Sequence, residues 1–193
     1  MKKLIFSTVL VVLTLSLSAQ FKFDLGLKGG VNFSKISFDV DDYNSESVTK
    51  THFGAFGRVG WGRLFLQPEL YFSSKGGKVD SDLLTAANNF NFETFDIPLL
   101  LGVRAIKGDN FDIQLVAGPV FSNITSKEIS SDEVFDTSFY NDHYFGIQYG
   151  LGIDVLFMTL HARMENGLGN FYKQAEKSGK NNTLMISVGF KFL

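Results

Sequence analysis

Hydrophobic and polar residues alternate along this chain in eight separate stretches. In the first, FKFDLGLKGGVNFS at residues 21–34, the apolar side chains occupy odd positions and the charged and polar ones even positions. Successive side chains of a β-strand point to opposite faces of a sheet, so a period of two predicts a strand with unlike faces. The same alternation predicts seven more strands, at residues 52–61, 63–72, 94–104, 111–121, 145–155, 158–165 and 183–192.

The connections between these strands alternate in length. The long ones are polar and rich in turn-forming residues, and the short ones are tight turns at Gly62-Arg63, Lys107-Gly108-Asp109 and Leu156-Phe157. Long loops at one end and tight turns at the other are typical of transmembrane barrels, with the turns and both chain ends in the periplasm. The predicted loops comprise residues 34–50, 73–91, 122–142 and 167–182.

The volume of the side chains indicates which face of the strands meets water. The bulky Phe, Leu, Ile and Val side chains of eight strands do not fit inside an eight-stranded barrel, whose interior is just wide enough for ordinary side chains. Glycine mixed with polar and charged residues fits well. We therefore predict an all-β, eight-stranded antiparallel up-and-down transmembrane β-barrel with its apolar face toward lipid. The alternative is a soluble exported ligand carrier with the apolar face inside.

The first nineteen residues have the pattern of a cleavable signal peptide. Met1-Lys2-Lys3 is charged, residues 4–15 are apolar, and Ser16-Leu17-Ser18-Ala19 supplies small residues for cleavage. The predicted organisation is a signal peptide at 1–19 and a single barrel domain at 20–193.

Composition narrows the possible partners. The chain has 18 Lys and Arg against 20 Asp and Glu, and the basic residues are dispersed, which argues against a nucleic-acid partner. It contains no Cys, so disulfides, thiolate metal sites and a lipid-modified Cys are excluded. Twenty-one Phe and nineteen Gly suit strands that present rings on one side and allow close packing on the other.

Several segments resemble bacterial outer-membrane β-barrel proteins of the PorT-like or porin family. They are FETFDIPLLLGVRA (92–105), VAGPVFSN (116–123), YFGIQYGLGIDVLF (144–157), LHARMENGLGNF (160–171) and the terminal LMISVGFKFL. The resemblance implies an outer-membrane location and insertion by the barrel-assembly machinery. It also implies that Val188, Phe190 and Phe192 belong to a C-terminal assembly signal.

Charged residues at the inward-facing positions of the predicted strands form the candidate site. Two interpretations remain open: a charged passage for a small solute, or a network of ion pairs that fills a narrow barrel, since buried charges must be paired. The predicted interior network consists of Asp24, Lys28, Arg58, Arg63, Glu69, Asp96, Arg104, Asp154, His161, Arg163, Glu165 and Lys191.

Catalysis has little support in the sequence. None of His52, His143 and His161 lies in a recognisable nucleophile or metal motif, so we predict no enzyme activity, no metal and no cofactor. Acidic residues in loops 34–50 and 122–142 offer oxygen ligands for calcium, but their spacing matches no calcium loop, and a solvated loop is the simpler interpretation. Trp61, Tyr43, Tyr140 and Tyr144 are candidate interfacial aromatics.

Three functions are compatible with these features. The first is a structural or binding role, in which the external loops meet a protein or ligand and lipid surrounds the wall. The second is a narrow channel or transporter for small solutes. The third is the soluble ligand carrier.

Overall fold

The computed structural model describes residues 21–38, 44–46, 48–80, 88–130, 143–168, 172–174 and 177–192. The predicted signal peptide at 1–19 lies outside the described residues. Within them, no helix is both long and apolar enough to cross a membrane.

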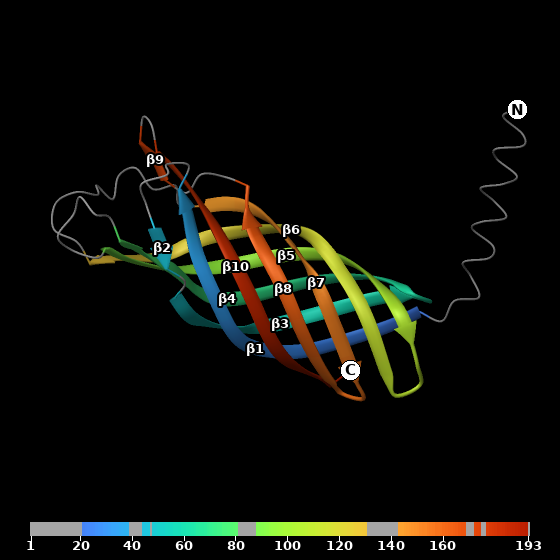
Figure 1. Cartoon of the computed structure of the whole chain (residues 1–193). Helices are drawn as coiled ribbons and strands as arrows, with labels where there is room; N and C mark the ends of the chain where they lie inside the picture. Colours follow the sequence, from blue (N-terminus) through green and yellow to red (C-terminus); the bar gives the residue numbers. More distant parts are fainter. Residues whose placement is uncertain are drawn as a thin grey trace, which may run out of the picture.

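Eight long strands form one closed antiparallel barrel (Figure 1). Their order around the wall follows the chain, and the wall closes because β1 pairs with β10 from Gly26↔Lys191 to Phe38↔Gly179. Two strands of three residues, β2 (Asn44–Glu46) and β9 (Tyr172–Gln174), pair with β4 and β10 near the end that carries the long connections. The long strands are β1 (Phe21–Phe38), β3 (Val48–Trp61), β4 (Leu64–Asp80), β5 (Asn88–Lys107), β6 (Phe111–Ser130), β7 (His143–Val155), β8 (Met158–Gly167) and β10 (Lys177–Lys191).

The predicted tight turns are confirmed. Gly62-Arg63 joins β3 to β4 and keeps Trp61 opposite Leu64, as the predicted register requires. Gly62 has a φ of 59° and Leu156, in the β7–β8 turn, has a φ of 52°. This left-handed conformation suits tight hairpins, although a leucine adopts it at a cost in strain.

The strands are longer than predicted at the loop end. β4 and β5 extend through Asp80 and from Asn88, so residues 73–80 and 88–91 are strand and not loop. β1, β6 and β10 also run into predicted loops, as far as Phe38, Ser130 and back to Lys177. The predicted strands are too short at this end because the alternation of apolar and polar residues stops there, and the residues at both odd and even positions are mostly polar.

The two faces of the wall differ as predicted. Polar and glycine positions point inward and are buried, whereas the large apolar side chains are exposed on the outside, for example Leu101 at 62% and Leu151 at 55%. Some inward-facing positions carry large apolar or aromatic side chains instead, and these are buried, for example Phe56, Phe65, Tyr71 and Leu100. This arrangement contradicts the alternative of a soluble carrier with an apolar interior.

The exposed apolar side chains form a continuous band with defined edges. On β3 and β4 it covers residues 53–61 and 64–72, and strands of about nine to eleven tilted residues span a hydrocarbon layer. Aromatic pairs mark both edges: Phe53 and Phe72 lie 5.7 Å apart at the loop side, and Phe21 and Trp61 lie 5.5 Å apart at the turn side, measured between ring centroids. Beyond the loop-side edge stand polar side chains, namely Thr49, Thr51, Ser74, Glu93, Asn123, Thr125, His143, Asn166 and Asn182.

Candidate functional site

Six acidic and six basic side chains form ion pairs inside the described part of the barrel. Eleven of these twelve residues are buried, and the Lys191 side chain is 9% exposed. Such charges are costly in a low-dielectric interior unless each lies close to an opposite charge. The six acids are Asp24, Glu69, Asp96, Asp112, Asp154 and Glu165, and the six bases are Lys28, Arg58, Lys75, Arg104, Arg163 and Lys191.

One ion pair crosses the lumen near the turn end. Arg58 on β3 and Asp154 on β7 stand on opposite sides of the barrel, and their side chains meet with Nη1 and Oδ2 2.5 Å apart. The Lys191 Nζ lies 2.9 Å from the same Oδ2, and Gln114 donates a hydrogen bond to Asp154 Oδ1 at 2.8 Å. Nearby, Arg104 pairs with Asp112 at 3.4 Å. The turn-end mouth is therefore bridged from wall to wall.

A second ion pair crosses the middle of the lumen. Arg163 on β8 reaches Glu69 on β4, again on the opposite wall, with Nη1 2.9 Å and 2.8 Å from the two carboxylate oxygens. Lys28 pairs with the same carboxylate from β1, and Gln67 donates to it at 2.5 Å. Glu69 thus has two cationic partners and is the centre of this layer.

A third ion pair crosses the lumen on the loop side. The Lys75 Nζ on β4 lies 2.5 Å from Glu165 Oε1 on β8 and 2.9 Å from Asp96 Oδ2. Tyr144 joins the pair, since its hydroxyl accepts from Lys75 at 2.8 Å and donates to Glu165 at 3.0 Å. Gln148 also donates to Glu165, at 2.8 Å. This layer has one base and two acids, which balances the excess base of the middle layer.

Apolar and aromatic groups fill the lumen between the turn-end and middle layers. Phe65, Leu100 and Val116 form a buried cluster with exposures of 1%, 0% and 3%. The guanidinium carbons of Arg58 and Arg104 lie 4.7 Å and 5.2 Å from the centroid of the Phe65 ring. Cations at such distances from an aromatic ring are attracted to its face. Side chains are therefore closely packed in the lumen between these two layers.

The structure brings together eleven of the twelve predicted network residues. Arg63 is the exception: it is exposed in the β3–β4 turn and donates to the carbonyl oxygen of Ala105 at 2.9 Å. Its position in a turn, outside the alternation of a strand, explains why parity failed there. Asp112 and Lys75 are also interior residues, but the predicted network does not include them. Lys75 falls in residues 73–91, which the sequence pattern predicts as a loop.

The candidate aromatic and imidazole groups have different surroundings. Tyr144 was predicted to lie at the membrane interface, but it is buried in the loop-side layer, so that prediction is wrong. Tyr43 and Tyr140 lie outside the described residues. His52 is buried and hydrogen-bonded to Asn32 and Ser187 at 2.7 Å and 2.8 Å.

The remaining two histidines lie on opposite faces of the wall. Arg163 donates to His161 Nδ1 at 2.7 Å, and the other ring nitrogen, Nε2, lies 3.0 Å from the Thr159 hydroxyl. His143 is exposed on the outer wall, with its ring 5.9 Å from that of Phe121. Within the described ranges, no group of three or more acidic or His side chains has the arrangement of a metal site.

The residues of the predicted assembly signal are exposed on β10 and directly after it. Val188, Phe190 and Phe192 are 42%, 51% and 58% exposed, so they belong to the apolar band. Their role in assembly stays a prediction. The side chains of the acidic loop residues considered for calcium lie outside the described part of the chain.

Comparison with known proteins gives one family match. The family described as outer membrane protein beta-barrel domain matches residues 18–173. No curated protein matches the sequence.

Several solved structures are similar in outline. Ail, the attachment invasion locus protein of Yersinia pestis, crystallised with the heparin analogue sucrose octasulfate, is 13% identical, with a TM-score of 0.46 over 89% of this chain and 99% of that one. Neisserial surface protein A is 11% identical, with a TM-score of 0.49 over 87% and 97%. The N-terminal barrel of Pseudomonas aeruginosa OprF is 13% identical, with a TM-score of 0.32 over 86% and 97%.

The family match and the exposed apolar band agree on location. A closed barrel with a band of lipid-compatible side chains is suited to span a membrane, and the matching family is one of outer-membrane barrels. The protein is an integral barrel of the bacterial outer membrane.

Proposed function

We propose that this chain, which belongs to the outer membrane protein beta-barrel domain family, is a closed anchor that conducts no solute and presents its loop-bearing end to a partner. Outer-membrane lipid surrounds its apolar wall. The partner is a protein or a ligand that meets the connections outside the membrane.

The observation that carries the proposal is the set of three ion pairs that span the lumen. Arg58–Asp154, Arg163–Glu69 and Lys75–Glu165 each join strands on opposite walls, at three successive levels. A solute would have to break all three pairs and leave buried charges without partners, which is unfavourable at each level. An eight-stranded barrel has room for side chains and little more. These features favour an anchor over the alternative of a narrow channel.

Conductance measurements test the closed state. The mature protein, reconstituted in a planar bilayer, is expected to show no current steps above leak, because each level of the lumen is filled by paired side chains. A large porin in the same bilayers serves as the positive control. Reproducible single-channel steps from the purified mature protein would contradict the closed state and favour the channel.

Loop replacement tests the binding role. Residues 39–47 and 131–142 are replaced, singly and together, by short Gly-Ser connections that leave β1, β3, β6 and β7 intact. We expect the barrel to fold, since loop length has a small effect on stability. We also expect that the variants no longer capture the partner from cells, or no longer support the cellular phenotype of the unsubstituted protein. Replacement of residues 108–110 in the opposite turn region is the control. If both loops can be replaced without any loss, the binding role is wrong.

The surroundings of the buried histidines and of β10 support two further expectations. We expect no enzyme activity, because His52 and His161 are held in buried hydrogen bonds. We also expect that the barrel-assembly machinery recognises β10 through Val188, Phe190 and Phe192, whose side chains share one exposed face.

A further inference from the structure

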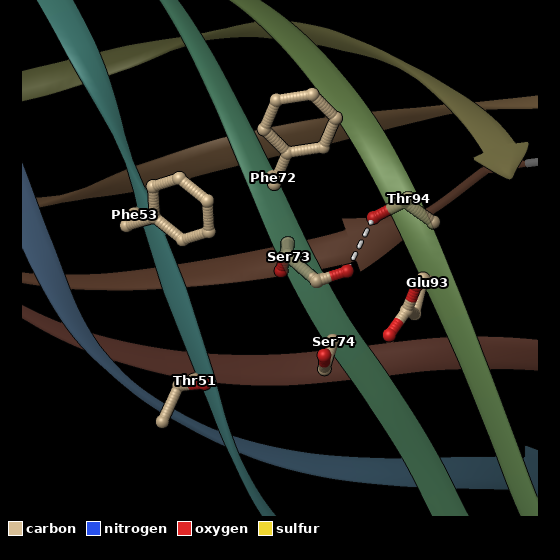
Figure 2. Close-up of a pocket in the computed structure, with 7 residues that line it drawn as sticks. All are labelled: Thr51, Phe53, Phe72, Ser73, Ser74, Glu93 and Thr94. Atoms are coloured by element: carbon tan, nitrogen blue, oxygen red, sulfur yellow. Dashed lines mark hydrogen bonds between the residues drawn. The ribbon is translucent and has the colours of Figure 1, made fainter. Parts of the chain in front are cut away.

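A hollow of about 320 Å³ interrupts the outer wall where the apolar band meets the polar side chains (Figure 2). It lies over β3, β4 and β5, at the loop side of the band. Its walls are formed by Thr51, Phe53, Phe72, Ser73, Ser74, Glu93 and Thr94.

The two sides of this hollow differ in chemistry. Figure 2 shows the rings of Phe53 and Phe72 along one side, with Thr51, Ser74 and Glu93 toward the other. The short Thr51 and Ser74 side chains follow directly on the large rings in the outward rows of β3 and β4, and this change in size creates the space. Its floor is fixed by the hydrogen bond from the Thr94 hydroxyl to the Ser73 carbonyl at 3.2 Å.

A bulge shapes the side of the hollow that carries Glu93. The register between β5 and β6 shifts between Glu93 and Thr94, and the Thr125 hydroxyl donates to the Glu93 carbonyl at 3.2 Å. Bulges are a common means of re-aiming a side chain. Among the described outward-facing side chains of the strands, Glu93 has the only carboxylate, and it is exposed.

Glu93 is the charged side chain among those that line the hollow. A smaller cavity of about 90 Å³ shares Ser74 and Glu93 with the hollow, but it is also lined by Lys50 and by the buried Lys75 and Phe92. Lys50 pairs with Asn32 and alternates with the outward-facing Thr51, so it belongs to the inward-facing row of β3. Within the described ranges, Glu93 belongs to no ion pair. The hollow therefore presents a carboxylate at the membrane boundary.

We propose that this space binds the headgroup of a lipid that carries phosphoethanolamine. The ammonium group donates hydrogen bonds to Glu93, the phosphate accepts hydrogen bonds from the Ser74 and Thr51 hydroxyls, and the first acyl carbons cover Phe53 and Phe72. Charge-assisted hydrogen bonds of this kind are stronger than neutral ones. A choline headgroup has the same phosphate but no N–H group, so it forfeits the contact with Glu93. The site is on the outer wall and does not depend on the function proposed above.

Native mass spectrometry of the mature barrel in detergent tests the site. Dimyristoyl phosphatidylethanolamine and dimyristoyl phosphatidylcholine have the same chains, so their binding ratio isolates the headgroup. We expect the ethanolamine lipid to bind about tenfold more tightly, since charge-assisted hydrogen bonds are lost with choline. Glu93→Gln is expected to bring the ratio close to one. Asp109→Asn, an equivalent charge change in the exposed β5–β6 turn, is expected to keep it.

Two further measurements complete the test. Heat-modifiable gel mobility shows that each variant is folded, so loss of selectivity is not loss of the barrel. Free phosphoethanolamine is expected not to displace the lipid, because it lacks the chains that cover Phe53 and Phe72. Equal binding of both lipids by the unsubstituted protein, an unchanged ratio in Glu93→Gln, or displacement by the free headgroup would each overturn the proposal.

Discussion

Replacing Glu69 with alanine is expected to destabilise the barrel by about 3–5 kcal/mol, the usual cost of removing one partner of a buried ion pair. The Glu69 side chain is fully buried and is the shared partner of Lys28 and Arg163. Its loss leaves two cations in the middle layer without an adjacent carboxylate. The effect falls on stability because all three side chains are inside the wall, away from lipid and solvent.

The measurement is equilibrium unfolding in urea in lipid vesicles, with the folded fraction read from heat-modifiable gel mobility. Glu93→Ala is the matched control, since the same carboxylate is removed from an exposed position, where we expect a change within about 0.5 kcal/mol. Combining Glu69→Ala with Lys28→Met should cost less than the sum of the two single changes, because one stranded cation is removed as well. Equal stabilities for Glu69→Ala and Glu93→Ala would mean that the middle layer contributes nothing.

Gly54→Val is expected to prevent the barrel from folding or to destabilise it strongly. Overpacking typically costs about 1–3 kcal/mol, and we expect a larger loss here. A side-chain carbon at Gly54 would stand closer than 3.0 Å to the Leu70 carbonyl oxygen and to the Cα and Cβ atoms of Tyr71. Backbone atoms of a paired strand cannot rotate out of the way. The strand pair would have to separate.

Gly57→Val on the same strand is the control for that substitution. Gly57 faces outward, and an added carbon there would meet only the Leu25 side chain, at 4.0 Å. Both variants have the same intrinsic preference for strand, so the difference between them reports the close approach of β3 and β4. We expect Gly57→Val to give the fast-migrating folded form in vesicles. A Gly54→Val protein as stable as Gly57→Val would contradict the geometry of this strand pair.

The alternation of apolar and polar residues was sufficient to predict most of the interior residues, because one face of each strand meets lipid and the other meets the lumen. Asp24, Lys28 and Arg58 occupy inward positions in strands whose other face is continuously apolar, so their placement followed from the alternation. The pairing of these charges was not predictable in the same way. Arg163 and Glu69 are 94 residues apart in the chain and meet because β4 and β8 lie opposite each other in the closed wall.

Prediction failed where the membrane ends. Lys75 and Tyr144 lie close to the loop-side edge of the band, where residues on both faces are polar and the period of two is lost. Lys75 was therefore assigned to a loop, and Tyr144 to an interface, although both point into the lumen and contact each other at 2.8 Å. The bulge at Glu93/Thr94 also has no signal in the alternation, so the hollow on the outer wall was not foreseen.

The pairing of β1 with β10 determines when the barrel can close during assembly. Gly26 pairs with Lys191, so the wall cannot close until almost the whole chain has emerged. Any earlier product is an open sheet with two unpaired edges and a broad apolar face, which is a form prone to aggregation. The cell must therefore keep the incomplete chain apart from its neighbours throughout export, and a chain that stops short of β10 would retain both edges permanently.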